Sequence, residues 1–366
     1  MRAIVPNRTL ATPPIQLRLM YRRVFRPATR PSSRHRASRH PSNVAPMPNS
    51  SFRHLLFLVA LTLASLTPTR ASNLELSPTV SAILDQIYSG DLSAAIEGAR
   101  HLQTDQPTHP LGYLLEAEAL WWKIWCTSAE FKYGMSYPRH RPKLPGDQHY
   151  LDLAAKATSL AEVQVAQQDT AEMQFYAGMG DALLARFYGL RGENRNGARA
   201  GVRARERFLR AIALDPHLAD AYTGLGLYNY YADTLSAAAR VLRFFMGIPG
   251  GNKQEGIQQL QCAIGEGVLT PTEARFYLAI NLHNYDQKYE QALEIARPLA
   301  EKYSTNPLFQ LILGDLYAKL GRRQLAEQRY RTAAALPVSD KECHNHIRNL
   351  VQASLAAIGA APPTPR

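Results

Sequence analysis

The sequence predicts an all-α protein made of stacked helical hairpins. Near the C-terminal end, small and aromatic residues recur at the spacing of a helix–turn–helix unit, and Ala292 and Ala326 lie 34 residues apart. Tyr289 and Ala296 belong to the earlier of these two units. A hairpin of this length cannot bury its apolar face alone, so neighbouring units have to stack on one another.

The last unit carries the pattern most completely. Its first helix holds Leu313, Gly314 and Tyr317, and its second helix holds Ala326 and Tyr330. Small residues let paired helices approach closely, while leucine and tyrosine fill the space between layers. This arrangement resembles the tetratricopeptide-repeat family. The resemblance implies a right-handed solenoid of about six helix pairs.

Two other parts of the chain match the same pattern. Ala204, Phe208, Ala211 and Pro216 close one unit, Tyr222, Leu225 and Gly226 open the next, and Gly90, Leu92, Ala95, Ala99 and Pro107 fit the second half of the first unit. From these anchors we expect helix pairs to start near residues 76, 110, 171, 219, 273 and 307. The repeats would then span residues 72–340.

Other segments are expected to interrupt or end the repeats. The Pro-rich stretch near 131–148 is typical of a loop, and the segment near 233–252 inserts an apolar helix followed by a Gly- and Pro-rich turn. Residues 341–358 form an amphipathic pattern, typical of a helix that caps the last repeat. The tail, 359–366, is predicted to be disordered from its composition.

The first 71 residues differ from the rest. Residues 1–46 are rich in Arg, Pro and Ser, and residues 47–71 have the short apolar run and small-residue cleavage site of a signal peptide. We favour an over-extended gene start, true initiation at Met47, cleavage after Ala71 and export to the periplasm. The alternative is that 1–46 is a transit peptide, which would place the protein in an organelle lumen.

The charge is confined to this leader. The formal net charge of +12 at pH 7 would by itself suggest a nucleic-acid or membrane binder. Residues 1–71 contain twelve Arg and no Lys, Asp or Glu, so residues 72–366 carry 30 basic and 30 acidic residues. The mature chain is therefore neutral, and the argument for a nucleic-acid partner disappears. The apolar run at 55–66 is too short for an ordinary transmembrane helix, so no transmembrane segment is expected in the mature chain.

The sequence contains no motif that predicts catalysis, a cofactor or a metal. Three widely spaced cysteines, Cys126, Cys262 and Cys343, do not predict a disulfide framework. Cys343 and His346 could share a metal from one helical face, but a closed zinc site needs about four ligands. The stretch 247–254 lacks the Gly–Lys–Ser/Thr ending of a phosphate-binding loop. No nucleophile–base pattern occurs, and we expect a non-catalytic protein without a cofactor.

The candidate binding residues follow from the resemblance. In tetratricopeptide-repeat proteins the first helix of each pair lines a concave groove, and aromatic residues there often anchor a partner. By register, the groove residues here are Trp121, Trp122, Phe175, Tyr230, Tyr231, Tyr277, Asn281, Asn284 and Tyr285. Some of them, above all the two tryptophans, could instead belong to the core between helices.

A second candidate surface is a basic strip. Arg195, Arg199, Arg203 and Arg207 recur every four residues and would share one helical face. This strip could dock an acidic partner or anionic lipid headgroups, as a peripheral membrane contact, or be a solvated face balanced by acidic neighbours. The function we expect is an exported scaffold that binds another protein through the groove. The alternatives are a binding protein for a small hydrophobic or glycan ligand, or a non-catalytic subunit of an enzyme complex.

Overall fold

The computed structural model describes residues 74–128, 130–131, 135–136, 146–236, 239–240, 243–244 and 247–360. All described residues belong to one unit, Thr69–Arg366. The predicted leader (1–46), the predicted signal peptide (47–71) and residues 361–366 of the tail lie outside the described residues.

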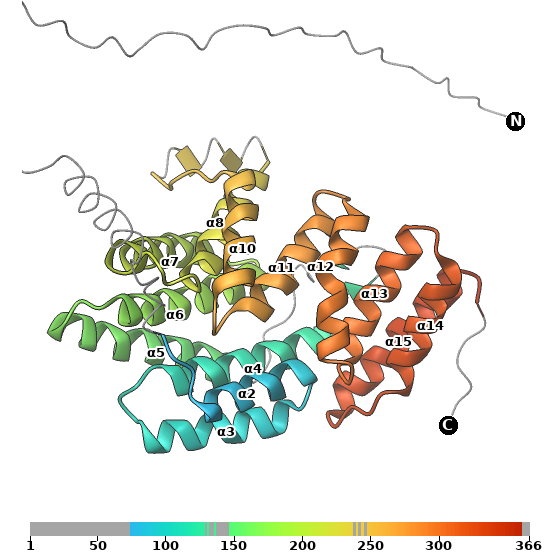
Figure 1. The fold of residues 1–366 in the computed structure, drawn as a ribbon, viewed down its shortest axis with the longest axis horizontal. Helices are drawn as coiled ribbons and strands as arrows, with labels where there is room; N and C mark the ends of the chain where they lie inside the picture. The colour runs from blue at the N-terminus through green and yellow to red at the C-terminus, as the bar shows by residue number, and fades with distance from the viewer. Residues whose placement is uncertain are drawn as a thin grey trace, which may run out of the picture. The chain divides into compact units, whose positions relative to one another are not determined.

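The described chain is helical, and neighbouring helices pack in pairs (Figure 1). This confirms the all-α fold class. The helices are α2 (Pro78–Ser89), α3 (Leu92–Asp105), α4 (Leu111–Ser128), α5 (Asp147–Gln167), α6 (Ala171–Leu190), α7 (Asn194–Leu214), α8 (Ala221–Thr234), α10 (Lys253–Glu266), α11 (Pro271–Asn284), α12 (Tyr289–Lys302), α13 (Pro307–Lys319), α14 (Arg323–Ala335) and α15 (Lys341–Ala357). The first helices of the pairs begin within two residues of the predicted starting points.

The helix ends follow ordinary capping chemistry. The Ser77 hydroxyl accepts the N–H of Val80 at 3.2 Å and caps the start of α2. Gly90, with φ of 89°, ends that helix in the left-handed conformation that glycine adopts without strain. The Asp340 carboxylate caps α15 in the same way as Ser77, because it accepts the N–H of Cys343 at 2.9 Å.

Glycines set how closely the paired helices approach. A Cβ atom at Gly314 of α13 would lie 2.5 Å from the ring of Tyr330 in α14. A Cβ atom at Gly226 of α8 would lie 2.8 Å from the carbonyl oxygen of Gly256 in α10. Both glycines belong to the repeat pattern, and each is needed for the close contact within its pair.

Asp220 joins two successive pairs. Its carboxylate, buried at the start of α8, accepts the N–H of Leu269 at 2.8 Å and the N–H of Thr270 at 2.7 Å. These amides precede α11, so one anionic side chain satisfies the donors of the turn that leads into the next pair. Hydrogen bonds to a charged acceptor are stronger than neutral ones, which fixes the spacing between α8 and α11.

The first and last helices of the unit also contact each other. The amide of Asn306, which precedes α13, donates to the backbone oxygen of Tyr88 in α2 at 2.8 Å, and the Tyr303 hydroxyl donates to Asp85 at 3.1 Å. A disulfide joins Cys126 of α4 to Cys343 of α15, with the two Cα atoms 5.1 Å apart. These contacts span 217 or 218 residues of sequence. The sequence analysis did not predict this disulfide, because the spacing of three cysteines says nothing about which helices meet.

The two predicted interruptions lie between helices. The first falls between α4 and α5 and contains the antiparallel two-residue strands β1 (Glu130–Phe131) and β2 (Met135–Ser136). The second falls between α8 and α10, where the Tyr228 hydroxyl donates to the backbone oxygen of Pro249 at 2.8 Å. Among the described residues, no helix has the length and apolar character needed to cross a membrane.

Candidate functional site

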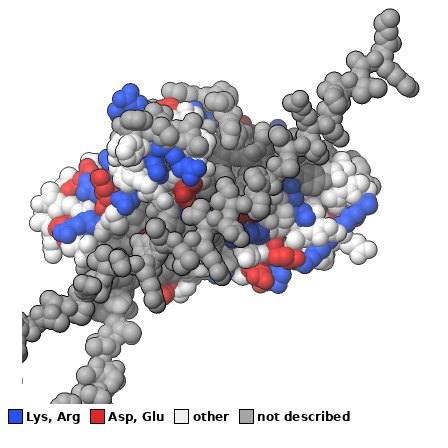
Figure 2. All heavy atoms as spheres, turned by 90° about the horizontal axis from the view of Figure 1, so that it is seen from above, with Lys and Arg blue, Asp and Glu red and all other residues white. Residues whose placement is uncertain are grey.

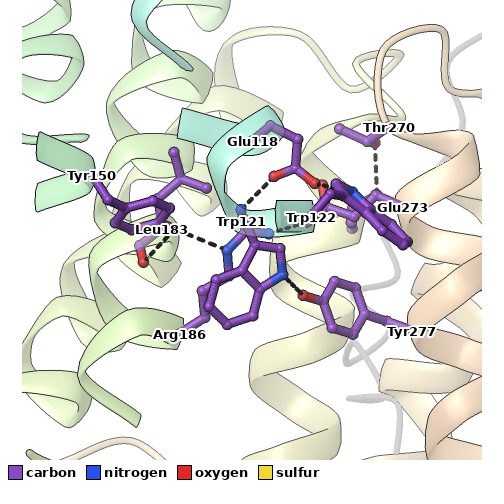
Figure 3. A network of polar contacts seen from close by, with 10 residues as sticks. Glu118, Trp121, Trp122, Tyr150, Leu183, Arg186, Thr270, Glu273 and Tyr277 are labelled. Carbon is purple, nitrogen blue, oxygen red and sulfur yellow. Dashed lines mark hydrogen bonds and ion pairs between the residues drawn. The ribbon is translucent and has the colours of Figure 1, made fainter. Parts of the chain in front are cut away.

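Charged and aromatic side chains meet in the interior, where α4, α6 and α11 come together (Figure 3). Arg186 of α6 forms an ion pair with Glu118 of α4 and donates a hydrogen bond to the carboxyl group of Glu273 of α11 at 3.1 Å. The side chains of Arg186 and Glu273 are each only 15% exposed. We call Glu118, Arg186 and Glu273 the buried charge cluster. It connects three helices that lie far apart in the sequence.

Aromatic groups hold the cluster in place. The Arg186 guanidinium lies 4.4 Å from the ring centroid of Trp121, a cation–π contact, and its Nε donates to the Tyr150 hydroxyl at 3.1 Å. The Trp122 indole N–H donates to Glu118 at 2.9 Å, and the Trp121 indole N–H donates to the Tyr277 hydroxyl at 3.0 Å. The polar atom of each of these aromatic side chains therefore has a hydrogen-bond partner, as buried polar groups require.

The cluster contains two carboxyl groups and one guanidinium. The pKa of Glu273 is raised from 4.5 to about 8, mainly by burial and also by the charge of Glu118, while the charge of Arg186 opposes this rise. Burial also raises the pKa of the Tyr150 hydroxyl. At neutral pH Glu273 is therefore mostly protonated, and Arg186 and Glu118 form an ion pair with no net charge. This arrangement suits a closed interior, where an excess charge would be costly.

Most of the predicted groove residues are buried. This holds for Trp121, Trp122, Phe175, Tyr230, Tyr277 and Asn281. The expectation that these side chains are accessible to a partner is wrong in this structure. Trp122 of α4 is buried because its ring packs 4.7 Å from the ring of Phe276 in α11 and 5.6 Å from that of Phe309 in α13, and Phe175 is buried because its ring packs 6.1 Å from that of Phe208 in α7. Helices of this chain therefore occupy the predicted groove, where a partner was expected to bind.

Three predicted groove residues remain partly accessible: Tyr231, Asn284 and Tyr285. Tyr285 is 50% exposed, and its ring centroid lies 6.0 Å from that of Tyr231. The Tyr231 hydroxyl donates to the side-chain oxygen of the buried Asn281 at 2.9 Å, which orients the ring. We call Tyr231, Asn284 and Tyr285 the tyrosine patch.

The predicted basic strip lies on α7, and part of it is neutralised within the chain. Arg203 pairs with Asp181 at 2.5 Å, and Arg207 pairs with Glu162 at 2.6 Å. Arg195 and Arg199 are exposed near the start of the helix. On the face drawn in Figure 2, the basic and acidic side chains of the described residues are interspersed. This arrangement supports the interpretation of the strip as a solvated, balanced face.

The other candidate motifs have structural roles. Cys343 is bonded to Cys126 and so is unavailable to a metal, and no group of three or more metal-ligating side chains occurs among the described residues. In the Gly-rich stretch at 247–254, the Asn252 side chain accepts the N–H of Glu255 at 3.2 Å and caps α10. This is the helix-to-helix turn expected in place of a phosphate loop.

Sequence reasoning missed the buried charge cluster because its members belong to three different helix pairs. One signal was present in α4, where Glu118 lies among apolar and aromatic residues. An ionisable side chain in such a helix has to find a buried partner. Nothing in the local pattern says that the partner is Arg186, 68 residues away.

Comparison with known proteins adds no family to this description. No protein-family model matches the chain, and no curated protein matches it. The chain has to be interpreted from its own geometry.

Proposed function

We propose that this chain is an exported, non-catalytic helical-repeat scaffold that binds another protein. Its helix pairs would form a right-handed solenoid of the tetratricopeptide-repeat type, with α15 as the cap of the last pair. The signal-peptide pattern and the Cys126–Cys343 disulfide both support export, because disulfides persist mainly in oxidising compartments such as the periplasm. The burial of the charge cluster supports a non-catalytic role, since a reacting group needs access to its substrate.

The partner would bind at the tyrosine patch. This proposal depends on one observation: of the predicted groove residues, those of the patch reach the surface, with Tyr285 half exposed and Tyr231 packed beside it. Aromatic side chains bury much area and lose little conformational entropy on binding, so exposed tyrosines often dominate the affinity of an interface.

Capture of a partner from the exported compartment tests this function. The mature chain and its Tyr285→Ala variant would be used as baits, with Tyr188→Ala, a partly exposed tyrosine of α6, as the matched control. We expect Tyr285→Ala to weaken capture at least tenfold and Tyr188→Ala to leave it unchanged, because truncating an anchoring aromatic costs about 2 kcal/mol or more. Equal capture by all three baits would contradict the tyrosine patch as the binding surface.

A further inference from the structure

The segment between α8 and α10 carries the most exposed large apolar side chain of the described residues. We call residues 235–249 the apolar insertion, and its described residues lie beyond the C-terminal end of α8 (Figure 1). The side chain of Phe244 is 78% exposed, and Leu235 at the start of the insertion is 38% exposed. Phenylalanine is usually buried in a folded chain, so apolar side chains exposed in one segment indicate a contact outside the fold.

The same segment carries charge of one sign. Residues 234–254 contain Arg240, Arg243 and Lys253 and no Asp or Glu, although residues 72–366 are neutral as a whole. The Lys253 ammonium pairs with Asp286 at 2.6 Å, which leaves the two arginines as the charge of the insertion. Arg240 is exposed and precedes Phe244 by one helical turn, so the two side chains share one face.

Hydrogen bonds hold the insertion on the end of α8. Arg243 donates to the backbone oxygen of Ala232 at 3.1 Å, and the Tyr228 hydroxyl donates to that of Pro249 at 2.8 Å. The Arg205 guanidinium of α7 lies 5.5 Å from the centroid of the Tyr228 ring. Burial raises the pKa of Tyr228, and the charges of Arg205 and Arg243 oppose this rise. A third positive charge therefore lies at the base of the insertion.

These arginines are not neutralised by the described part of the chain. Arg205, Arg240 and Arg243 take part in none of the ion pairs between described residues. On α7, by contrast, Arg203 and Arg207 each pair with a carboxylate of the same chain. The insertion thus combines exposed apolar side chains with positive charge that can attract an anionic surface.

We propose that the apolar insertion binds the surface of a bilayer that contains anionic phospholipid. Phe244 enters the boundary between headgroups and acyl chains, while the guanidinium of Arg240 stays at the level of the phosphates. A helix of the fifteen residues 235–249 would be about 22 Å long, which is less than the roughly 30 Å of a hydrocarbon core. The insertion therefore lies on the membrane and does not cross it.

A bilayer suits these residues better than a protein groove does. Attraction to anionic headgroups requires one sign of charge and apolar side chains beside it, and it requires no matching shape. This contact goes beyond protein binding at the tyrosine patch and does not depend on it. A Tyr285→Ala chain should therefore bind vesicles as the unchanged chain does.

Vesicle flotation tests the contact. The chain from Ser72 would be used, because the twelve Arg of the leader would bind anionic vesicles by themselves, and it contains nearly the whole unit Thr69–Arg366. Vesicles of phosphatidylcholine alone would be compared with vesicles that contain about one third phosphatidylglycerol. We expect at least tenfold tighter binding to the anionic vesicles, and weaker binding at high salt, because salt screens the attraction.

Single variants locate the contact on the chain. Phe244→Ala should weaken binding to the anionic vesicles about tenfold, and Arg240→Gln about fivefold, because each removes one exposed group that contacts lipid. Val163→Ala, at a valine of α5 that is 56% exposed, and Arg199→Gln, at an exposed arginine of α7, are the matched controls and should bind as the unchanged chain. Circular dichroism should show that all four variants keep the fold, since the changed side chains are exposed.

A tryptophan at Phe244 reports how deeply the insertion enters the bilayer. Relative to the unchanged chain, Phe244→Trp should gain fluorescence that shifts to shorter wavelength on anionic vesicles and is quenched by brominated lipid. Val163→Trp should show neither change. Absence of binding to anionic vesicles would overturn the proposal, as would equal binding by the unchanged chain, Phe244→Ala and Arg240→Gln. Loss of protein capture by Phe244→Ala, without vesicle binding by the unchanged chain, would assign the insertion to a protein partner instead.

Discussion

The indole N–H of Trp121 donates to the hydroxyl of Tyr277 at 3.0 Å, across 156 residues of sequence. Both residues were predicted to line an open groove, and in the structure they bind each other in the interior. The bond connects α4 to α11 beside the buried charge cluster (Figure 3). At this point the predicted groove is therefore filled by side chains of the chain itself.

Removal of this bond should destabilise the protein without changing its surface. Tyr277→Phe leaves the Trp121 N–H buried without this acceptor, and we expect a loss of about 1–3 kcal/mol in the free energy of unfolding. Urea denaturation followed by circular dichroism would measure it. Tyr285→Phe, at a half-exposed tyrosine, is the control and should stay within about 0.5 kcal/mol of the unchanged chain. Equal stability of both variants would mean that the Trp121–Tyr277 bond contributes nothing.

The buried charge cluster should make stability depend on pH. The pKa of Glu273 is raised from 4.5 to about 8 in the folded chain, so between these values the folded state binds a proton that the unfolded state has released. The stabilisation from this proton is complete below pH 4.5 and is lost as pH rises towards 8, with a limiting slope of about 1.4 kcal/mol per pH unit.

Two variants isolate this effect. Glu273→Gln keeps a neutral side chain of the same size, so stability should fall less steeply between pH 5 and 8 than in the unchanged chain. Glu290→Gln removes a carboxylate of an exposed ion pair with Arg322 and should leave the slope as it was. Burial raises the pKa of Asp315 to about 7, so this residue also makes stability fall as pH rises. It does so equally in the unchanged chain and in both variants. The hypothesis fails if Glu273→Gln keeps the full slope.

The close approach of α13 and α14 should not tolerate a large side chain at Gly314. Because a Cβ atom there would lie 2.5 Å from the Tyr330 ring, Gly314→Leu should overpack the pair and lower stability by about 1–3 kcal/mol. Gly265→Leu in α10 is the control, since a Cβ atom at that position meets nothing within 4 Å. Thermal unfolding of the two variants compares them directly; an unchanged melting temperature for Gly314→Leu would refute the close contact.

Export should remove the basic leader. If the signal peptide is cleaved after Ala71, the mature chain begins at Ser72 and carries equal numbers of basic and acidic residues. The intact mass of the native protein, with N-terminal sequencing, would establish its first residue. A native chain that retains residues 1–46 would contradict both initiation at Met47 and this cleavage site.

The repeat pattern predicted the helices and their pairing well, for a local physical reason. Residues such as Gly314 and Tyr330 contact each other within one hairpin, and Asp220 caps the turn of the next pair. Contacts of this range depend on the order of residues in the sequence and on the period of the helix. For this reason the predicted starting points of the pairs lie within two residues of the observed ones.

The sequence by itself determined the helical hairpins, the glycines that let them pair and the neutrality of the chain after its leader. Only the tertiary structure decided that Cys126 meets Cys343, that Arg186 lies between Glu118 and Glu273, and that Trp121 is buried against Tyr277. These pairs lie 68 to 217 residues apart. Which distant helices meet depends on the packing of all the helix pairs that lie between them in the sequence. The pattern within one helix pair carries no information about that packing, so these contacts could not be inferred from it.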